Sequence, residues 1–198
     1  MGKLVNKITD TLIENGTVSE KDRDVYHYCI TGVVEMGMAL IVTLVLSLIM
    51  GKLTETLLFL LIIIPLRSIA GGYHANSGRM CFLLSVLFYL SAIFMSAFIY
   101  KHLDVKYSLW IYITFSVLIL IEAPVDSKNK RLSAEEKSEL KRKCLFLFLP
   151  FSLFFAVLWL LTIKLSFDLS GFCYLMSCCM VLVFLMMTAG KIKNKAGK

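Results

Sequence analysis

The chain has 198 residues, 58% of them hydrophobic, and a formal net charge of +7. Its apolar residues are concentrated in long blocks, which excludes a water-soluble globule and predicts an all-α, polytopic membrane protein. The basic residues lie between those blocks, where they set topology and meet anionic lipid headgroups. The positive charge therefore predicts the lipid bilayer as a partner, and no nucleic acid.

The length suits one compact bundle of membrane helices, so we predict a single integral membrane domain over residues 1–198. Within it we expect an interfacial arm at 1–28, six membrane segments within 29–190 and a basic cytoplasmic tail at 191–198. No cleavable signal peptide is predicted, because the first apolar block begins near Cys29, too late for a signal sequence.

The arm begins with an amphipathic pattern that predicts a helix. Asn15-Gly16 predicts the end of that helix, and Ser19 predicts the cap of a second short helix. The first helix either lies on the membrane surface and grips a partner, or is a plain anchor before the membrane. Its apolar residues, spaced to share one face, are Leu4, Val5, Ile8, Leu12 and Ile13.

Six apolar blocks follow, and each is near the ~20 residues that a helix needs to cross ~30 Å of hydrocarbon. The second block is short and ends in Ile69-Ala70-Gly71-Gly72, so we expect an irregular end there. The blocks run over 29–50, 53–70, 80–100, 107–125, 144–163 and 169–190.

The lysines and arginines are distributed very unevenly between the two sides of the membrane. Of the 21 in the chain, one side holds all but Lys52, Lys101, Lys106 and Lys164. The basic side carries both termini and the loops after the second and fourth blocks. Basic loops stay in the cytoplasm, which predicts that both termini and these two loops are cytoplasmic.

The six cysteines do not form the pattern of a disulfide framework. Five of them lie in or beside apolar segments and are interpreted as small buried hydrophobes. Those five are Cys29, Cys144, Cys173, Cys178 and Cys179. Cys81 has different neighbours.

The segment from Arg67 to Cys81 holds three glycines, a histidine, two arginines and a cysteine. These residues are costly at membrane depth unless they face protein or water. In an unbroken helix His74 and Cys81 would lie about 10.5 Å apart along the axis. The breaks at Gly71-Gly72 and Asn76-Ser77-Gly78 allow the chain to fold back and bring the two together.

If Ser77 caps the third block, Cys81 falls in its first turn, where the helix dipole and Arg79 favour a thiolate. His74 would take the thiol proton and return it to a leaving amine. The alternatives are a water-satisfied histidine at headgroup level and one more helix cysteine. One histidine and one cysteine fall short of the three or four ligands that zinc takes, so neither a metal nor a cofactor is predicted.

A second polar segment follows the fourth block. Pro124 ends that block, and Ser133 to Glu136 form a capping box that opens a short charged helix through Lys143. This region is either a solvated face or a basic cradle for an acidic ligand. Glu35 and Glu122 are candidates for orienting His74 or for a packing role. The candidate substrate-binding residues are Arg67, Arg79, Lys128, Lys130 and Arg131.

The chain resembles the accessory gene regulator protein B family. The resemblance rests on Gly-Gly-Tyr-His with Cys81 seven residues later, and on Ala-Pro-Val-Asp-Ser-Lys-Asn-Lys at 123–130. Chain length, the six blocks and cytoplasmic termini agree with it, so it covers essentially the whole chain. The resemblance implies a membrane cysteine endopeptidase of Gram-positive quorum sensing.

Such proteins cut the acidic carboxy-terminal tail from a small propeptide and hold the rest as a thioester, which a propeptide cysteine or serine closes into a thiolactone or lactone. By the same resemblance Cys81 is the nucleophile and His74 the general base, and no third catalytic residue is assigned. A homodimer is left open. The alternatives are a non-enzymatic peptide exporter or pore, with His74 and Arg67 lining its path, and a structural scaffold.

Overall fold

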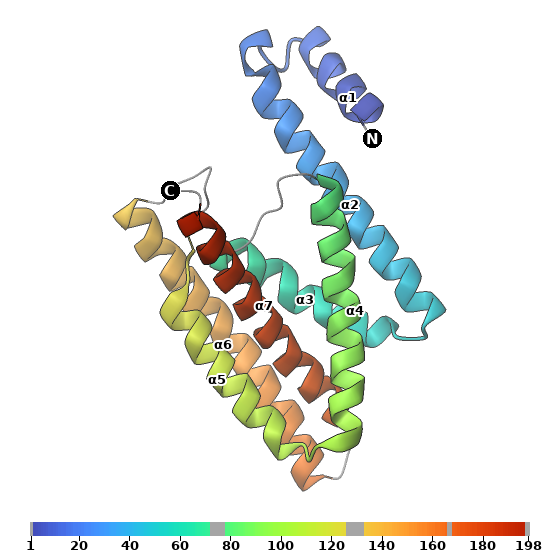
Figure 1. The fold of residues 1–198 in the computed structure, drawn as a ribbon, viewed down its shortest axis with the longest axis vertical. Helices are drawn as coiled ribbons and strands as arrows, with labels where there is room; N and C mark the ends of the chain where they lie inside the picture. The colour runs from blue at the N-terminus through green and yellow to red at the C-terminus, as the bar shows by residue number, and fades with distance from the viewer. Residues whose placement is uncertain (1, 72–77, 126–132, 166–167, 197–198) are drawn as a thin grey trace. The chain divides into compact units, whose positions relative to one another are not determined.

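A computed structural model describes residues 2–71, 78–125, 133–165 and 168–196 (Figure 1). These residues form helices and no strand, which confirms the all-α fold class. In chain order the elements are α1 (Gly2–Glu14), the 3-10 turn η1 (Glu20–Asp22), α2 (Arg23–Ile49), α3 (Leu53–Ala70), α4 (Gly78–His102), α5 (Lys106–Glu122), α6 (Ala134–Lys164) and α7 (Ser170–Ala196).

The six helices α2 to α7 correspond to the six predicted apolar blocks. Within the described part of the chain, five of them are long and apolar enough to cross a membrane, so this is a multi-pass membrane protein. The sixth, α5, has 17 residues and spans about 26 Å, slightly less than the ~30 Å of hydrocarbon. The predicted number of six spans is therefore matched only roughly.

The boundary of α5 differs from the predicted block for a local reason. The helix ends at Glu122, because Ala123 is extended, with φ −75° and ψ 150°. A residue before proline is sterically biased away from the helical region, and Pro124 follows Ala123 directly. Residues 123–125 therefore leave the helix and become available to contact other elements.

The predicted short charged helix is not a separate element. Its start is confirmed, because the Ser133 N–H donates to Glu136 Oε2 (2.9 Å) and the Glu136 N–H donates to Ser133 Oγ (3.1 Å). The helix then runs on without interruption for 31 residues as α6. Residues 134–149 contain no glycine or proline, so the change from charged to apolar sequence at Cys144 does not break the helix.

The chain divides into two compact units. The first comprises Met1–Met50 and Ala75–Leu87, and the second comprises Gly51–His74 and Phe88–Lys198. The division reflects packing within each unit, and the prediction of a single membrane domain stays a prediction.

In the first unit, α1 packs against the amino-terminal part of α2. The helix stop is confirmed: α1 ends at Glu14, and Gly16 has a φ of +68°. Ser19 is confirmed as a cap, but the element that it caps is only the three-residue turn η1, which leads directly into α2.

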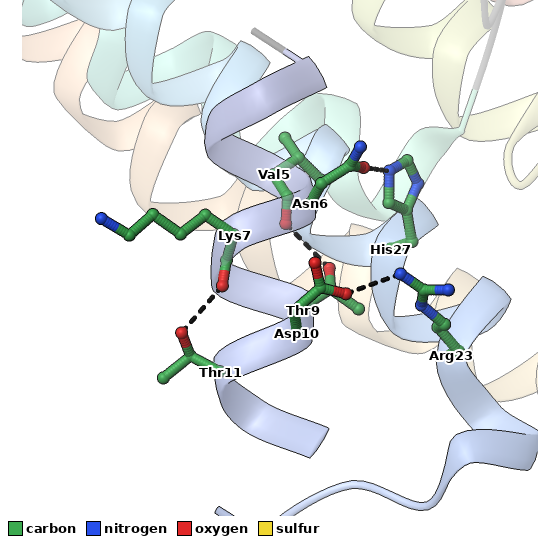
Figure 2. A network of polar contacts seen from close by, with 8 residues as sticks. All are labelled: Val5, Asn6, Lys7, Thr9, Asp10, Thr11, Arg23 and His27. Carbon is green, nitrogen blue, oxygen red and sulfur yellow. Dashed lines mark hydrogen bonds and ion pairs between the residues drawn. The ribbon is translucent and has the colours of Figure 1, made fainter. Parts of the chain in front are cut away.

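Two polar contacts join α1 to α2 (Figure 2). His27 Nε2 lies 2.8 Å from Asn6 Oδ1, and Arg23 Nη2 lies 2.6 Å from Asp10 Oδ1. The pairing of an early α1 residue with a later α2 residue shows that the two helices run antiparallel. Val5, on the predicted apolar face, is only 2% exposed. The apolar face of α1 is therefore covered in part by this protein's own chain.

In the second unit, α7 is the central helix and contacts α3, α5 and α6 (Figure 1). The largest of its fully buried side chains are Tyr174, Leu175, Met176, Met180 and Met187. Hydrogen bonds from α7 supplement this packing. Ser177 Oγ donates to the Ser108 carbonyl (2.9 Å), and the Tyr174 hydroxyl donates to the Asp104 carbonyl (2.6 Å). Lipid cannot satisfy such groups, so these contacts hold the amino-terminal end of α5 against α7.

Candidate functional site

The carboxyl ends of α3 and α5 meet in the second unit, and this junction joins the two polar segments singled out in the sequence. The Val125 N–H donates a hydrogen bond to the Ala70 carbonyl oxygen at 3.0 Å. Ala70, Ala123 and Val125 are all buried, with exposures of 0%, 5% and 7%. The first segment thus contacts the second through its backbone, although Ala70 and Val125 are 55 positions apart in the chain.

Gly71 makes the close approach at this junction possible. Its φ of +73° and ψ of −163° belong to a backbone region that is essentially restricted to glycine. A Cβ atom on Gly71 would lie 2.6 Å from the Val125 carbonyl oxygen, well inside normal contact distance. Both the conformation and the space therefore require glycine. The predicted irregular end of the second block is confirmed, with α3 ending at Ala70.

Charged groups lie at the same helix ends. The Nζ atom of Lys191, in α7, lies 3.1 Å from the Oε2 atom of Glu122. Glu122 is the last residue of α5. The two charged groups are close enough to form an ion pair, but their orientation does not allow a hydrogen bond. Arg67, in the last turn of α3, is half-buried and makes no ion pair or hydrogen bond through its guanidinium with the described residues. The structure thus gives Glu122 a cationic partner on another helix.

Cys81 is the fourth residue of α4 and lies in its first turn. This agrees with the position expected from the sequence, while Ser77 itself lies outside the described residues. The residue is partly exposed, and its carbonyl accepts a hydrogen bond from Ser85 Oγ (2.9 Å). Cys81 belongs to the first compact unit and the junction belongs to the second.

The other five cysteines were all predicted to be buried. Four of the five predicted to be buried are so: Cys144, Cys173, Cys178 and Cys179. The fifth prediction is wrong, because Cys29 is exposed on α2. It occupies a face of α2 that no described residue covers, and a linear apolar pattern does not say which face of a membrane helix meets protein and which meets lipid.

Several of the predicted site residues fall outside the described parts of the chain, so the dyad with Cys81 and the basic cradle stay predictions. These residues are His74, Lys128, Lys130 and Arg131. The backbone of Arg79 is described as part of α4, and its side chain is not.

Lys191 was expected only as part of a basic tail and was not predicted to make a specific contact. In the structure α7 continues to Ala196, so Lys191 lies within the helix and points its ammonium at Glu122. One signal for this contact was present: Glu122 closes an apolar block, and a carboxylate at membrane depth needs a partner. The sequence pattern did not indicate which of the many nearby cations that partner is.

Comparisons with known proteins agree on one family. Residues 5–189 match the family described as Accessory gene regulator B (AgrB). The chain is 28% identical over 141 residues to AgrB-like protein 2 of Clostridium perfringens (strain 13 / Type A), covering 69% of this chain and 66% of that protein. It is 26% identical, with the same coverage, to an AgrB-like protein of Clostridium perfringens (strain SM101 / Type A). The match thus spans just under two thirds of each relative, and no solved structure matches the chain.

The junction predicts a large effect of a methyl group at Gly71. Gly71→Ala should lower the free energy of unfolding by about 1–3 kcal/mol, since a side chain is strained in this conformation and meets the Val125 carbonyl. The measurement is thermal unfolding of the purified protein in detergent.

Gly51→Ala is the matched control, because Gly51 also has a positive φ (+63°) but has open space where its Cβ atom would lie. It should cost less than Gly71→Ala. Equal losses in the two variants would show that the close contact with Val125 contributes nothing beyond backbone strain.

Proposed function

Because this chain belongs to the Accessory gene regulator B family, we propose that it is a membrane cysteine endopeptidase of quorum sensing. Its substrate is a small propeptide with an acidic carboxy-terminal tail, and the bond that it cuts joins the signal part of the propeptide to that tail. The product remains on Cys81 as a thioester until it closes into a thiolactone or lactone ring. No metal or cofactor is needed for this chemistry.

The observation that carries the proposal is the setting of Cys81. Four of the six cysteines are buried, and a buried thiol cannot reach a peptide substrate. Cys81 is partly exposed and lies in the first turn of α4, at the positive end of the helix dipole. Cys29 is exposed too, but it is the seventh residue of α2, beyond the first turn where the dipole acts.

The reaction has two steps. His74 takes the proton of the Cys81 thiol, and the sulfur attacks the scissile carbonyl carbon. The C–N bond breaks, His74 gives its proton to the leaving amine, and the tail departs while the signal part stays bound as a thioester. A thiol or hydroxyl of the propeptide then attacks the thioester, which forms the ring and returns the proton and the free thiol to the enzyme.

We assign substrate recognition to the cations of the two polar segments. Arg67 lies in the last turn of α3 with its guanidinium unpaired among the described residues. Lys128 follows Val125 by three residues, and His74 follows Gly71 by three. The proposed base and the basic loop therefore each follow, three residues later in the sequence, a backbone segment that takes part in the junction. Arg79, Lys130 and Arg131 complete the proposed set.

We place both termini and this site in the cytoplasm. Support comes from the distribution of lysine and arginine, which are concentrated on the side that holds the loops after α3 and α5.

The alternative of a peptide exporter or pore finds less support in the second unit. Its central helix, α7, is surrounded by α3, α5 and α6 and fills the middle of the bundle with large buried side chains, Tyr174, Leu175, Met176, Met180 and Met187 among them. A peptide path through this described bundle would require these side chains to separate.

The first test is removal of the nucleophile. Cys81→Ala should abolish cleavage of the cognate propeptide while the protein still inserts into membranes, because no other group would form the thioester. Cys29→Ala is the matched control, since that thiol is also exposed, and it should leave activity unchanged. The measurement is release of the propeptide tail by purified protein in nanodiscs. Cleavage by Cys81→Ala would disprove the mechanism, and a parent protein that releases no tail would favour the exporter instead.

Orientation is tested by thiol labelling. In a Cys29→Ala background, Cys81 is the only cysteine that is not buried. A membrane-impermeant maleimide should then label inverted vesicles and not intact cells, because the thiol faces the cytoplasm. Labelling of intact cells would reverse the assigned topology.

The basic loop is tested by charge reversal. Changing Lys128, Lys130 and Arg131 to Glu together should raise KM more than it lowers kcat, because surface charges mainly govern encounter and register. Each exposed pair is worth only ~0.2–1 kcal/mol, so no single reversal should be decisive. Added salt should weaken processing by the parent protein, since the Debye length falls to ~3 Å at 1 M. An unchanged KM together with no salt dependence would leave these residues as topology signals alone.

A further inference from the structure

Lys191 and Glu122 form a contact between α7 and α5 that the proposed mechanism does not use. Their charged atoms are 3.1 Å apart, and the side chains are 39% and 29% exposed. Both are therefore partly removed from solvent, which strengthens the attraction compared with a fully exposed pair. The two residues lie 69 positions apart in the chain, so the contact depends on the packing of α7 beside α5.

The position of Glu122 determines where the junction forms. Glu122 is the last helical residue of α5, and Ala123 begins the extended segment that ends with Val125. The Val125 N–H then reaches the Ala70 carbonyl at 3.0 Å. A shift of Glu122 would move Val125 with it, because only two residues separate them.

Little movement is tolerated at the other side of the junction. A Cβ atom added to Gly71 would lie 2.6 Å from the Val125 carbonyl oxygen, so the two backbones are in close contact. The position of the Gly71 backbone, and with it the end of α3 that carries Arg67, follows the position of Val125. The chain of contacts runs from Lys191 to Glu122, from Glu122 through Val125, and from Val125 to Ala70 and Gly71.

We propose that Lys191 is a positioning residue of the peptidase, which holds the junction of α3 and α5 in place through its ion pair with Glu122. The inference rests on the proposed function, because it is the cleavage reaction that the junction serves. Lys191 does not touch substrate. It acts by keeping the ends of α3 and α5 at the spacing that Gly71 and Val125 require.

The kinetic test uses Lys191→Met, which keeps the aliphatic length and removes the charge. It should lower kcat on the order of 10-fold and also raise KM, because Arg67 lies on the displaced end of α3 and a misplacement of about 1 Å can cost ~10²-fold in rate. Lys191→Arg should retain activity. Glu122→Lys should be impaired as a single change and partly rescued in combination with Lys191→Glu, because the swap restores the attraction.

Lys106→Met is the matched control, because Lys106 faces Asp104 at the opposite end of α5, at 3.9 Å. It should leave kcat unchanged. The inference would be overturned if kcat fell equally in Lys191→Met and Lys106→Met, or if kcat were unchanged in Lys191→Met. It would also be overturned if the charge swap were no more active than the single changes.

A second readout separates this inference from the proposed function. Hydrogen exchange of the Val125 amide reports its bond to Ala70 directly and needs no substrate. Exchange should be faster in Lys191→Met than in the parent and unchanged in Lys106→Met. Faster exchange would support the positioning role even if Cys81→Ala still cleaved the propeptide, an outcome that would disprove only the proposed function. Unchanged exchange in Lys191→Met would overturn the positioning role even if Cys81 proved essential.

Discussion

The hydrogen bond from the Val125 N–H to the Ala70 carbonyl is the contact on which the arrangement of this end of the second unit depends. The last carbonyls of a helix have no partner within it, and α3 ends at Ala70. Val125 likewise lies beyond the end of α5. Ala70 and Val125 are both buried, so neither group can rely on water and each satisfies the other. This requirement accounts for the glycine at position 71 and for the burial of Ala123 and Val125.

The junction is in turn supported by α7. Association between membrane helices lacks the hydrophobic driving force of water, so it relies on close packing and on polar contacts between helices. Ser177 and Tyr174 bond to backbone carbonyls near the amino-terminal end of α5, and Lys191 pairs with its carboxyl end. α5 is thereby held at both ends by the helix that is most buried. Contacts with α7 therefore determine the position of α5, which is the shortest of the six apolar helices.

Much of the fold could be predicted from the sequence, because crossing hydrocarbon imposes a length and a composition that are visible in one dimension. The apolar blocks, the stop at Gly16, the capping box at Ser133 and the end of α3 were all expected and are present. These features depend only on neighbours along the chain. The continuity of α6 across Lys143 and Cys144 was missed, because a change from charged to apolar residues resembles a boundary and is not a backbone break.

The residue types of the candidate site and its family pattern could be predicted from the sequence. The contacts that bring its parts together could not. The sequence identified Arg67, Cys81 and Glu122 as unusual, but it gave no indication that Ala70 bonds to Val125 or that Glu122 pairs with Lys191. It also placed Cys29 among the buried cysteines, because composition does not distinguish a face that meets protein from one that does not. Such pairings join residues 55 and 69 positions apart, and no local periodicity encodes them. They are decided only when α7 packs against α3 and α5, since that packing alone brings the helix ends within reach of one another.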